Sequence, residues 1–147
     1  MTLKKPMKLA VAFYIENKKG EFTAIKRLPD DESLPDVWGL SAASLRGGED
    51  YEQAVKRGAS EKLGIKVNKM QFVGEDEIER PKYFLKLREY RILGYENKPN
   101  LQGGDKYYAK FAWQKDPEIF RKAAEKGSLC SRIFLRNRGL WDGEEKK

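Results

Sequence analysis

The chemistry that this sequence could perform is concentrated between residues 43 and 65, where acidic and basic side chains stand at regular spacings. Positions 58, 61 and 62 have the spacing i, i+3 and i+4, so on a helix their side chains share one face. Carboxylates on one helical face can hold divalent cations, which neutralise phosphates and activate water. Of the three positions only Glu61 is acidic, because Gly58 has no side chain and Lys62 carries a positive charge.

The same segment resembles the Nudix box, Gly-x5-Glu-x7-Arg-Glu-U-x-Glu-Glu-x-Gly-U, in which U is a bulky aliphatic residue. Five positions match the pattern: Glu49, Arg57, Glu61, Gly64 and Ile65. Three positions depart from it: the opening glycine is Ala43, the glutamate after the arginine is Gly58, and the last glutamate is Lys62. We therefore interpret residues 43–65 as a degenerate Nudix box.

The residues before the box support this resemblance. Trp38, Gly39 and Leu40 stand where the family commonly shows Trp-x-Leu-Pro-Gly-Gly, although residues 41–43 depart from the Pro-Gly-Gly part. The resemblance implies an α+β fold, a Nudix-like α/β/α sandwich with a mixed sheet between helices. It covers roughly residues 8–135.

The resemblance also implies an activity, the hydrolysis of nucleoside diphosphates linked to another group, X, with Mg²⁺ or Mn²⁺. It assigns catalytic roles to Glu61, Glu49 and Arg57, with Glu61 and Glu49 as the metal ligands. Because two of the three acids on the helix face are replaced, the hydrolysis is expected to be weak or lost, and a metal cofactor is expected only if activity remains.

Each of these residues also has a structural interpretation. Glu49 could pair with Arg57 to hold the loop against the helix, and Glu61 could be a solvated helix acid. Lys62 could be an ordinary surface lysine, or its ammonium could replace the missing ion as a phosphate ligand.

Other positions complete the predicted site. Gly58 costs a helix roughly 0.5–1 kcal/mol relative to alanine, so either the close approach of a ligand or loop, or drift after the loss of catalysis, should explain it. Trp38 could stack on a base or fill the core, and Arg27 could contact a phosphate. A replacement carboxylate could come from a loop; the candidates are Glu75, Asp76, Glu77, Glu79 and Asp105.

Composition limits the chemistry further. The 147 residues fit one domain, with residues 142–147 expected to be a frayed tail. Histidine is absent and Cys130 is the only cysteine, so histidine-based nucleophilic pairs and the usual zinc sites are excluded. Cys130 is expected to be a small buried hydrophobe rather than a reactive thiol. The net charge of +7 favours an anionic partner.

The pattern of apolar residues predicts the elements. Residues 8–16 and 21–27 predict two strands joined by a turn, and residues 28–37 predict a loop. Asp50 and Gln53 form the capping box of a helix that Gly64 ends. Its buried stripe is predicted at Val55, Ala59 and Leu63.

The second half of the chain is predicted to continue with strands. Residues 69–73 predict a short strand, residues 75–79 an acidic loop, and residues 83–95 a bent or bulged strand. Residues 107–113 alternate as a further strand, and a second, final helix is predicted from Asp116 and Pro117 to Gly127.

Three functions remain open at this point. The first is hydrolysis of a nucleotide-linked diphosphate, and the second is a non-catalytic nucleotide sensor in which Lys62 and Arg27 replace Mg²⁺. The third is an RNA or ribonucleoprotein-binding domain, suggested by the net charge alone. No apolar run approaches the roughly 18 residues of a membrane span, so we expect a cytoplasmic protein without a membrane partner. A homodimer is left open by family knowledge.

Overall fold

Two β-sheets occupy the middle of the fold, and the computed structural model describes them and their covering helices over residues 5–28, 37–101 and 108–141. The strands span Met7–Ile15 (β1), Phe22–Arg27 (β2), Trp38–Gly39 (β3), Ser41–Ser44 (β4), Lys66–Glu79 (β5), Phe84–Glu96 (β6) and Tyr108–Gln114 (β7). The larger sheet has the order β4-β1-β6-β5, in which β1 and β6 run parallel and the other neighbours antiparallel. The smaller sheet, β3-β2-β7, is antiparallel throughout.

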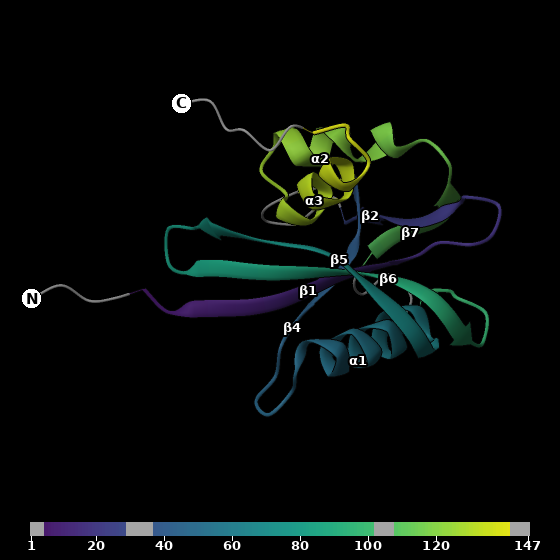
Figure 1. The fold of residues 1–147 in the computed structure, drawn as a ribbon, viewed down its shortest axis with the longest axis horizontal. Helices are drawn as coiled ribbons and strands as arrows, with labels where there is room; N and C mark the ends of the chain where they lie inside the picture. The colour runs from purple at the N-terminus through teal and green to yellow at the C-terminus, as the bar shows by residue number, and fades with distance from the viewer. Residues whose placement is uncertain (1–4, 29–36, 102–107, 142–147) are drawn as a thin grey trace, which may run out of the picture.

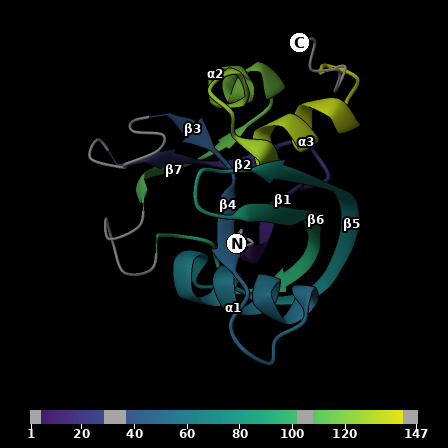
Figure 2. The same cartoon turned by 90° about the vertical axis from the view of Figure 1, so that its left-hand side faces the viewer.

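Helices cover both faces of the sheet layer. They span Tyr51–Leu63 (α1), Pro117–Phe120 (the 3₁₀ helix η2), Arg121–Glu125 (α2) and Leu129–Asn137 (α3). Helix α1 lies on one side of the strands and helices α2 and α3 lie on the other, as both views show (Figures 1 and 2). The predicted α+β class, with a mixed sheet between helices, is confirmed. No helix within the described ranges is long and apolar enough to cross a membrane.

Strand β1 divides the hydrophobic core in two because its side chains alternate between the faces. Val11, Phe13 and Ile15 pack into the cluster beneath α1. Ala10, Ala12 and Tyr14 pack into the cluster beneath α2 and α3. These six residues are at most 7% exposed, so β1 is buried on both faces and fixes the separation of the two helical layers.

Helix α1 forms where its capping residues predict it. The Asp50 carboxylate accepts a hydrogen bond from the Gln53 amide at 2.7 Å, and the Gln53 side chain accepts from the Asp50 amide at 2.8 Å. Gly64 ends the helix in the left-handed region at φ 70°. The predicted stripe of Val55, Ala59 and Leu63 is fully buried.

The acidic loop predicted at residues 75–79 is wrong, because these residues continue strand β5. Glu75 lies opposite Arg88 of β6, and the two side chains form an ion pair of 2.6 Å. Asp76 pairs with Arg136 of α3 at 3.0 Å. These acids therefore meet cations of the neighbouring strand and of α3, which favours a paired strand over a solvated loop. The bent or bulged strand predicted at residues 83–95 corresponds to β6, whose pairing with β5 shifts register at Leu93 of β6 and at Asn68 and Val73 of β5.

Between residues 116 and 141 the structure has three helical elements where one helix was predicted. The cap at Asp116 and Pro117 begins the 3₁₀ helix η2, which leads into the short α2, and Gly127 follows with φ 105°. Helix α3 then begins at Leu129 and is capped by Ser128, whose hydroxyl accepts a hydrogen bond from the Ser131 amide. The predicted final helix at residues 116–127 is therefore two short pieces, followed by helix α3, which was not predicted.

Glu89 of β6 is a buried acid beneath α3. It is fully buried, and neither carboxylate oxygen has a hydrogen-bond partner within the described residues. Burial raises the pKa of Glu89 well above its ordinary value, and the charges of Arg138 and Arg136 offset only part of that effect. Such a group is neutral in the fold at pH values where it ionises in the unfolded chain.

We predict that Glu89→Gln stabilises the protein at pH 8 but not at pH 4. Because the folded pKa is raised, the wild type loses stability as the pH rises above the ordinary value near 4.5, and the amide removes that loss. Urea denaturation at the two pH values measures the difference, with the exposed acid substitution Glu52→Gln as the control. An equal effect of Glu89→Gln at both pH values would contradict a neutral buried carboxyl.

Candidate functional site

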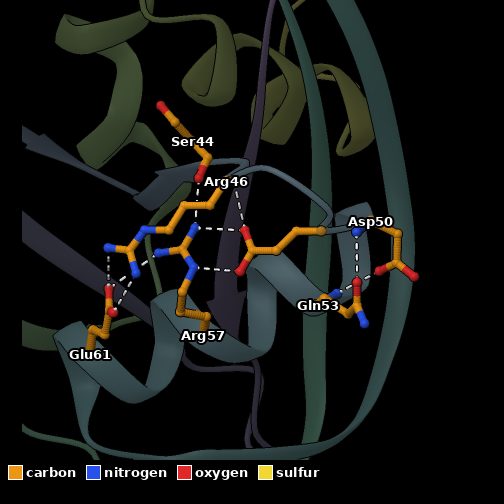
Figure 3. A network of polar contacts seen from close by, with 7 residues as sticks. Ser44, Arg46, Asp50, Gln53, Arg57 and Glu61 are labelled. Atoms are coloured by element: carbon orange, nitrogen blue, oxygen red, sulfur yellow. Dashed lines mark hydrogen bonds and ion pairs between the residues drawn. The ribbon is translucent and has the colours of Figure 1, made fainter.

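Glu49 and Arg57 form a two-point ion pair that joins the loop before α1 to the helix. Figure 3 shows the polar network around Arg57. The Arg57 Nε atom lies 2.6 Å from one Glu49 carboxylate oxygen, and its Nη2 atom lies 3.0 Å from the other. Arg57 also donates to the Ser44 carbonyl at 2.6 Å, and the Arg46 amide donates to Glu49 at 2.8 Å. These hydrogen bonds lower the pKa of Glu49 to about 2, with the Arg57 side chain as the main cause.

Glu61 lies one turn further along α1, where it contacts two arginines. Its carboxylate is 3.2 Å from Arg57 Nη1 and 3.1 Å from Arg46 Nη1 (Figure 3). The oxygens that a metal ion would need are therefore already held by guanidinium groups. Sequence analysis identified Arg57 but missed Arg46, which lies in the variable spacer of the box and has no motif position.

Lys62 is directed into the fold rather than out to water. Its ammonium donates a hydrogen bond to the Ala42 carbonyl of β4 and lies 5.9 Å from the ring centre of Tyr108. Burial lowers the pKa of Lys62, and the positive charge of Arg57 lowers it further. The ammonium thus occupies the space between α1 and β4, against a backbone carbonyl, where the last glutamate of the box would project.

Gly58 is explained by the close approach of α1 to the sheet. A Cβ atom at this position would lie 3.0 Å from the Ala43 Cβ and 3.1 Å from the Phe13 ring. These distances are shorter than ordinary carbon contacts, and both neighbours are held by β-pairing in the core. Ala43 and Gly58 both depart from the box, and they lie in contact. The Ala43 methyl group occupies the space that a Cβ atom at position 58 would need.

A cavity of about 270 Å³ opens beside Lys62. It is lined by Lys8, Ala10, Arg27, Ala42, Ala43, Ser44, Lys62, Arg80, Tyr83, Leu85, Leu87, Ser128, Leu129 and Cys130. Four of these residues are cationic and none is acidic, while leucine side chains supply an apolar wall. We call this space the inner cavity. An anion with an apolar part matches its lining.

The structure brings most of the predicted site residues into two groups. Glu49, Arg57 and Glu61 form the ion-pair network, whereas Lys62 and Arg27 line the inner cavity. Trp38 is half-buried, packs against the core beneath α2 and α3, and does not line the inner cavity. Its role in stacking stays a prediction.

The remaining candidates lie elsewhere. The acids of residues 75–79 belong to β5 and do not line the inner cavity, and Asp105 falls outside the described residues. Cys130 is buried as expected, and burial raises the pKa of its thiol. Lys8 and Arg80 line the inner cavity but were missed, because no motif links residues so far apart in sequence.

The residues of the box do not fit a divalent cation. No group of three or more acidic, histidine or cysteine side chains suited to a metal occurs within the described part of the chain. Glu61 is paired with two arginines, and the Lys62 ammonium is bonded to Ala42. Two like charges at about 4 Å repel by roughly 4 kcal/mol at an effective dielectric constant of 20, and a divalent ion doubles that value.

Comparison with known proteins identifies the family. The family model described as NUDIX domain matches residues 6–125. The chain therefore belongs to the Nudix family.

Two proteins with similar sequences match part of this chain. The chain is 37% identical over 73 residues to the isopentenyl-diphosphate Delta-isomerase of Paenarthrobacter aurescens, a match that covers 49% of this chain and 40% of that protein. It is 41% identical over 61 residues to an uncharacterised Nudix hydrolase of Listeria monocytogenes, covering 41% and 36%. The matched segments thus span less than half the length of these relatives.

Solved structures share the fold. The MutT protein from Methanosarcina mazei Go1 has a TM-score of 0.74 at 18% identity, over 97% of this chain and 100% of that chain. The ORF135 protein of E. coli has a TM-score of 0.72 at 17% identity, over 95% and 96%. At these identities the likeness concerns the fold alone.

We predict that Gly58 and Ala43 are coupled. Gly58→Ala alone should gain at most about 1 kcal/mol of helix propensity and lose roughly 1–3 kcal/mol through overpacking. In the Ala43→Gly background the added methyl group no longer meets the Ala43 Cβ and keeps only its close contact with the Phe13 ring, so the double-mutant cycle should show a favourable coupling of roughly 0.5–3 kcal/mol. Guanidinium denaturation of the four proteins measures it. Additive effects would show that this contact does not set the helix position.

Proposed function

We propose that this Nudix domain binds a nucleoside diphosphate linked to another group in its inner cavity, with weak or lost metal-dependent hydrolysis. The observation that carries the proposal is the Lys62 ammonium, which stands at the cavity against the Ala42 carbonyl. A lysine can bind phosphate as a point charge, whereas hydrolysis by the family mechanism needs clustered carboxylates that hold a metal.

The lining suggests how the ligand is held. Lys62 and Arg27 enter the inner cavity from α1 and β2 and supply donors for the oxygens of a diphosphate. Arginine can hold two phosphate oxygens at once, while lysine contributes a compact charge. The leucine wall at Leu85, Leu87 and Leu129 suits the apolar part of the ligand.

The lining of the inner cavity also argues against efficient hydrolysis. An attacking water needs a metal ion or a general base, and an acid or base typically contributes about 10²–10⁴ in rate. The inner cavity has no carboxylate among its lining residues. The Glu49–Arg57 pair supports a structural role, because Arg57 bonds both Glu49 and the Ser44 carbonyl and so joins the loop to α1.

A diphosphate on an aliphatic group is the second candidate ligand. It is favoured by the leucine wall of the inner cavity and by the partial match to a protein named isopentenyl-diphosphate Delta-isomerase. RNA remains the third alternative, and a steep fall in affinity with salt would favour it.

We predict that ADP-ribose binds in the presence of EDTA and that Lys62→Met weakens its binding by about 1.5–3 kcal/mol, the range for a hydrogen bond to a charged group. Titration calorimetry measures the affinities, with isopentenyl diphosphate as the second ligand. Lys56→Met is the matched control, because Lys56 is exposed on the same helix. Equal affinities for the wild type and Lys62→Met would show that Lys62 does not contribute to ligand binding.

We also predict that Mg²⁺ and Mn²⁺ do not stimulate hydrolysis of ADP-ribose or other nucleotide-linked diphosphates. The physical reason is the absence of an acid cluster in the described site, where two arginines hold Glu61. Product release is followed by chromatography with and without the metals. Turnover near the enzyme median of about 10 s⁻¹ would contradict the proposal and require a metal site outside the box.

A further inference from the structure

Strand β5 is the outer strand of the larger sheet, and its free edge is long. It runs over the 14 residues Lys66–Glu79, whereas an average strand has about 5–6. One side of β5 pairs with β6, and in the part of the chain that the structure describes no strand pairs with the other side. Figure 2 shows β5 beyond β6, between α1 and α3. Its outer backbone N–H and C=O groups can therefore pair with a strand of another chain.

The charges of β5 are separated along the strand. Lys66 and Lys69 lie toward its start, and four acids lie within residues 75–79 at its end. Lysines on an edge strand usually prevent two copies from pairing, because they repel one another. Here an antiparallel pair of two β5 strands places the basic end of each strand beside the acidic end of the other, whereas a parallel pair places like charges together. The charge pattern therefore favours a second copy of this chain, in the antiparallel orientation.

The bulges of β5 indicate the register of such a pair. Asn68 and Val73 each lack a partner on β6, so residues 69–72 and 74–77 are regular segments on either side of Val73. A two-fold axis at Val73 pairs the first segment of one copy with the second segment of the other. Lys69 then lies opposite Glu77, and Phe72 lies opposite Gly74.

Phe72 and Gly74 suit this register. Phe72 is 52% exposed, although its ring packs against Tyr90 with 5.8 Å between the ring centres. Gly74 has no side chain and leaves space beside it for the Phe72 ring of the second copy. An aromatic residue opposite a glycine of a neighbouring strand stabilises the pair. Pairing thus covers an exposed apolar ring at the middle of the edge.

Lys69 and Glu77 are also available for an ion pair between copies. The neighbouring acids are engaged within the chain, Glu75 with Arg88 and Asp76 with Arg136. Lys69 and Glu77 are exposed, and neither forms an ion pair with another described residue. Opposite charges directly across two antiparallel strands stabilise the pairing.

We propose that the free edge of β5 binds a second copy of this chain, in a two-fold symmetric dimer whose β5 strands pair antiparallel about Val73. The larger sheets of the two copies then form one continuous sheet. The two-fold axis makes the interface self-complementary, because the Lys69–Glu77 and Phe72–Gly74 contacts each occur twice. No residue of β5 lines the inner cavity, so the inference does not depend on the proposed ligand.

Sedimentation equilibrium of the full chain at low salt tests the interface. The wild type should form a dimer. Lys69→Glu places two acids opposite each other and Glu77→Lys places two lysines opposite each other, so each single variant should raise the dimer dissociation constant by about 10-fold. The swapped variant Lys69→Glu/Glu77→Lys restores opposite charges and should return to within about 3-fold of the wild type. Lys19→Glu is the matched control, because it makes the same charge change at an exposed position in the turn between β1 and β2.

Each outcome decides for or against the dimer. A wild type that sediments as a monomer up to roughly 1 mM would overturn the proposal. A dimer that is unchanged in both single variants would use another surface and would overturn it as well. If the swapped variant is as weak as the single variants, or if Lys19→Glu weakens the dimer equally, Lys69 and Glu77 do not face each other and the proposed pairing is wrong. Weakening in each single variant with recovery in the swapped variant supports it.

Discussion

The distance between helix α1 and strand β4 governs the arrangement of this site. At Gly58 the helix backbone rests against the Ala43 methyl group and the Phe13 ring, where a Cβ atom would be only 3.0–3.1 Å from carbon. A carboxylate at position 58 does not fit that contact without movement of the sheet. The approach also brings Lys62 within hydrogen-bonding distance of the Ala42 carbonyl. The three departures from the box therefore form one packing arrangement, in which a metal-binding face is replaced by close contact and an ammonium group.

The distribution of charged side chains at the site follows from the same contact between α1 and β4. The acids that remain in the box are neutralised within the protein, Glu49 by Arg57 and Glu61 by Arg57 and Arg46. The cations of the inner cavity lie apart from these acids, and Lys62 is buried enough for its pKa to be lowered. A cavity lined by four cations and no acid attracts an anion. This charge distribution is the basis for the proposed binding of a nucleotide-linked diphosphate.

The sequence predicted the local features well and the distant ones poorly. The capping box at Asp50, the stop at Gly64 and the ion pair of Glu49 with Arg57 depend on neighbours in sequence, and each is present in the structure. Strand β5 was missed at its acidic end because the cations that stabilise it, such as Arg88 and Arg136, come from other elements. Helix α3 was missed although Leu129, Cys130, Ile133 and Phe134 have helical spacing after the Ser128 cap, because the helix has only 9 residues and its pattern is short.

Part of the site could not have been found from the sequence for the same reason. Lys8, Arg27, Lys62 and Arg80 meet at one cavity only because the strands and α1 fold together. The sequence offered ligand contact, loop contact or drift as reasons for Gly58, and its contact with Ala43 and Phe13 is visible only in three dimensions. The motif therefore identifies the positions that depart from the box, and the packing in the fold explains why these departures are compatible with one another.

Paramagnetic NMR with Mn²⁺ tests the central claim most directly, which is that the box of this chain does not hold a divalent ion. Mn²⁺ broadens the signals of nuclei close to its binding site, so titration of ¹⁵N-labelled protein with ADP present locates any bound ion. The account predicts that the amides of Ala42, Ala43, Glu61 and Lys62 broaden no more than those of exposed acids such as Glu52. Saturable broadening centred on Glu61 and Ala42 at stoichiometric Mn²⁺ would contradict it.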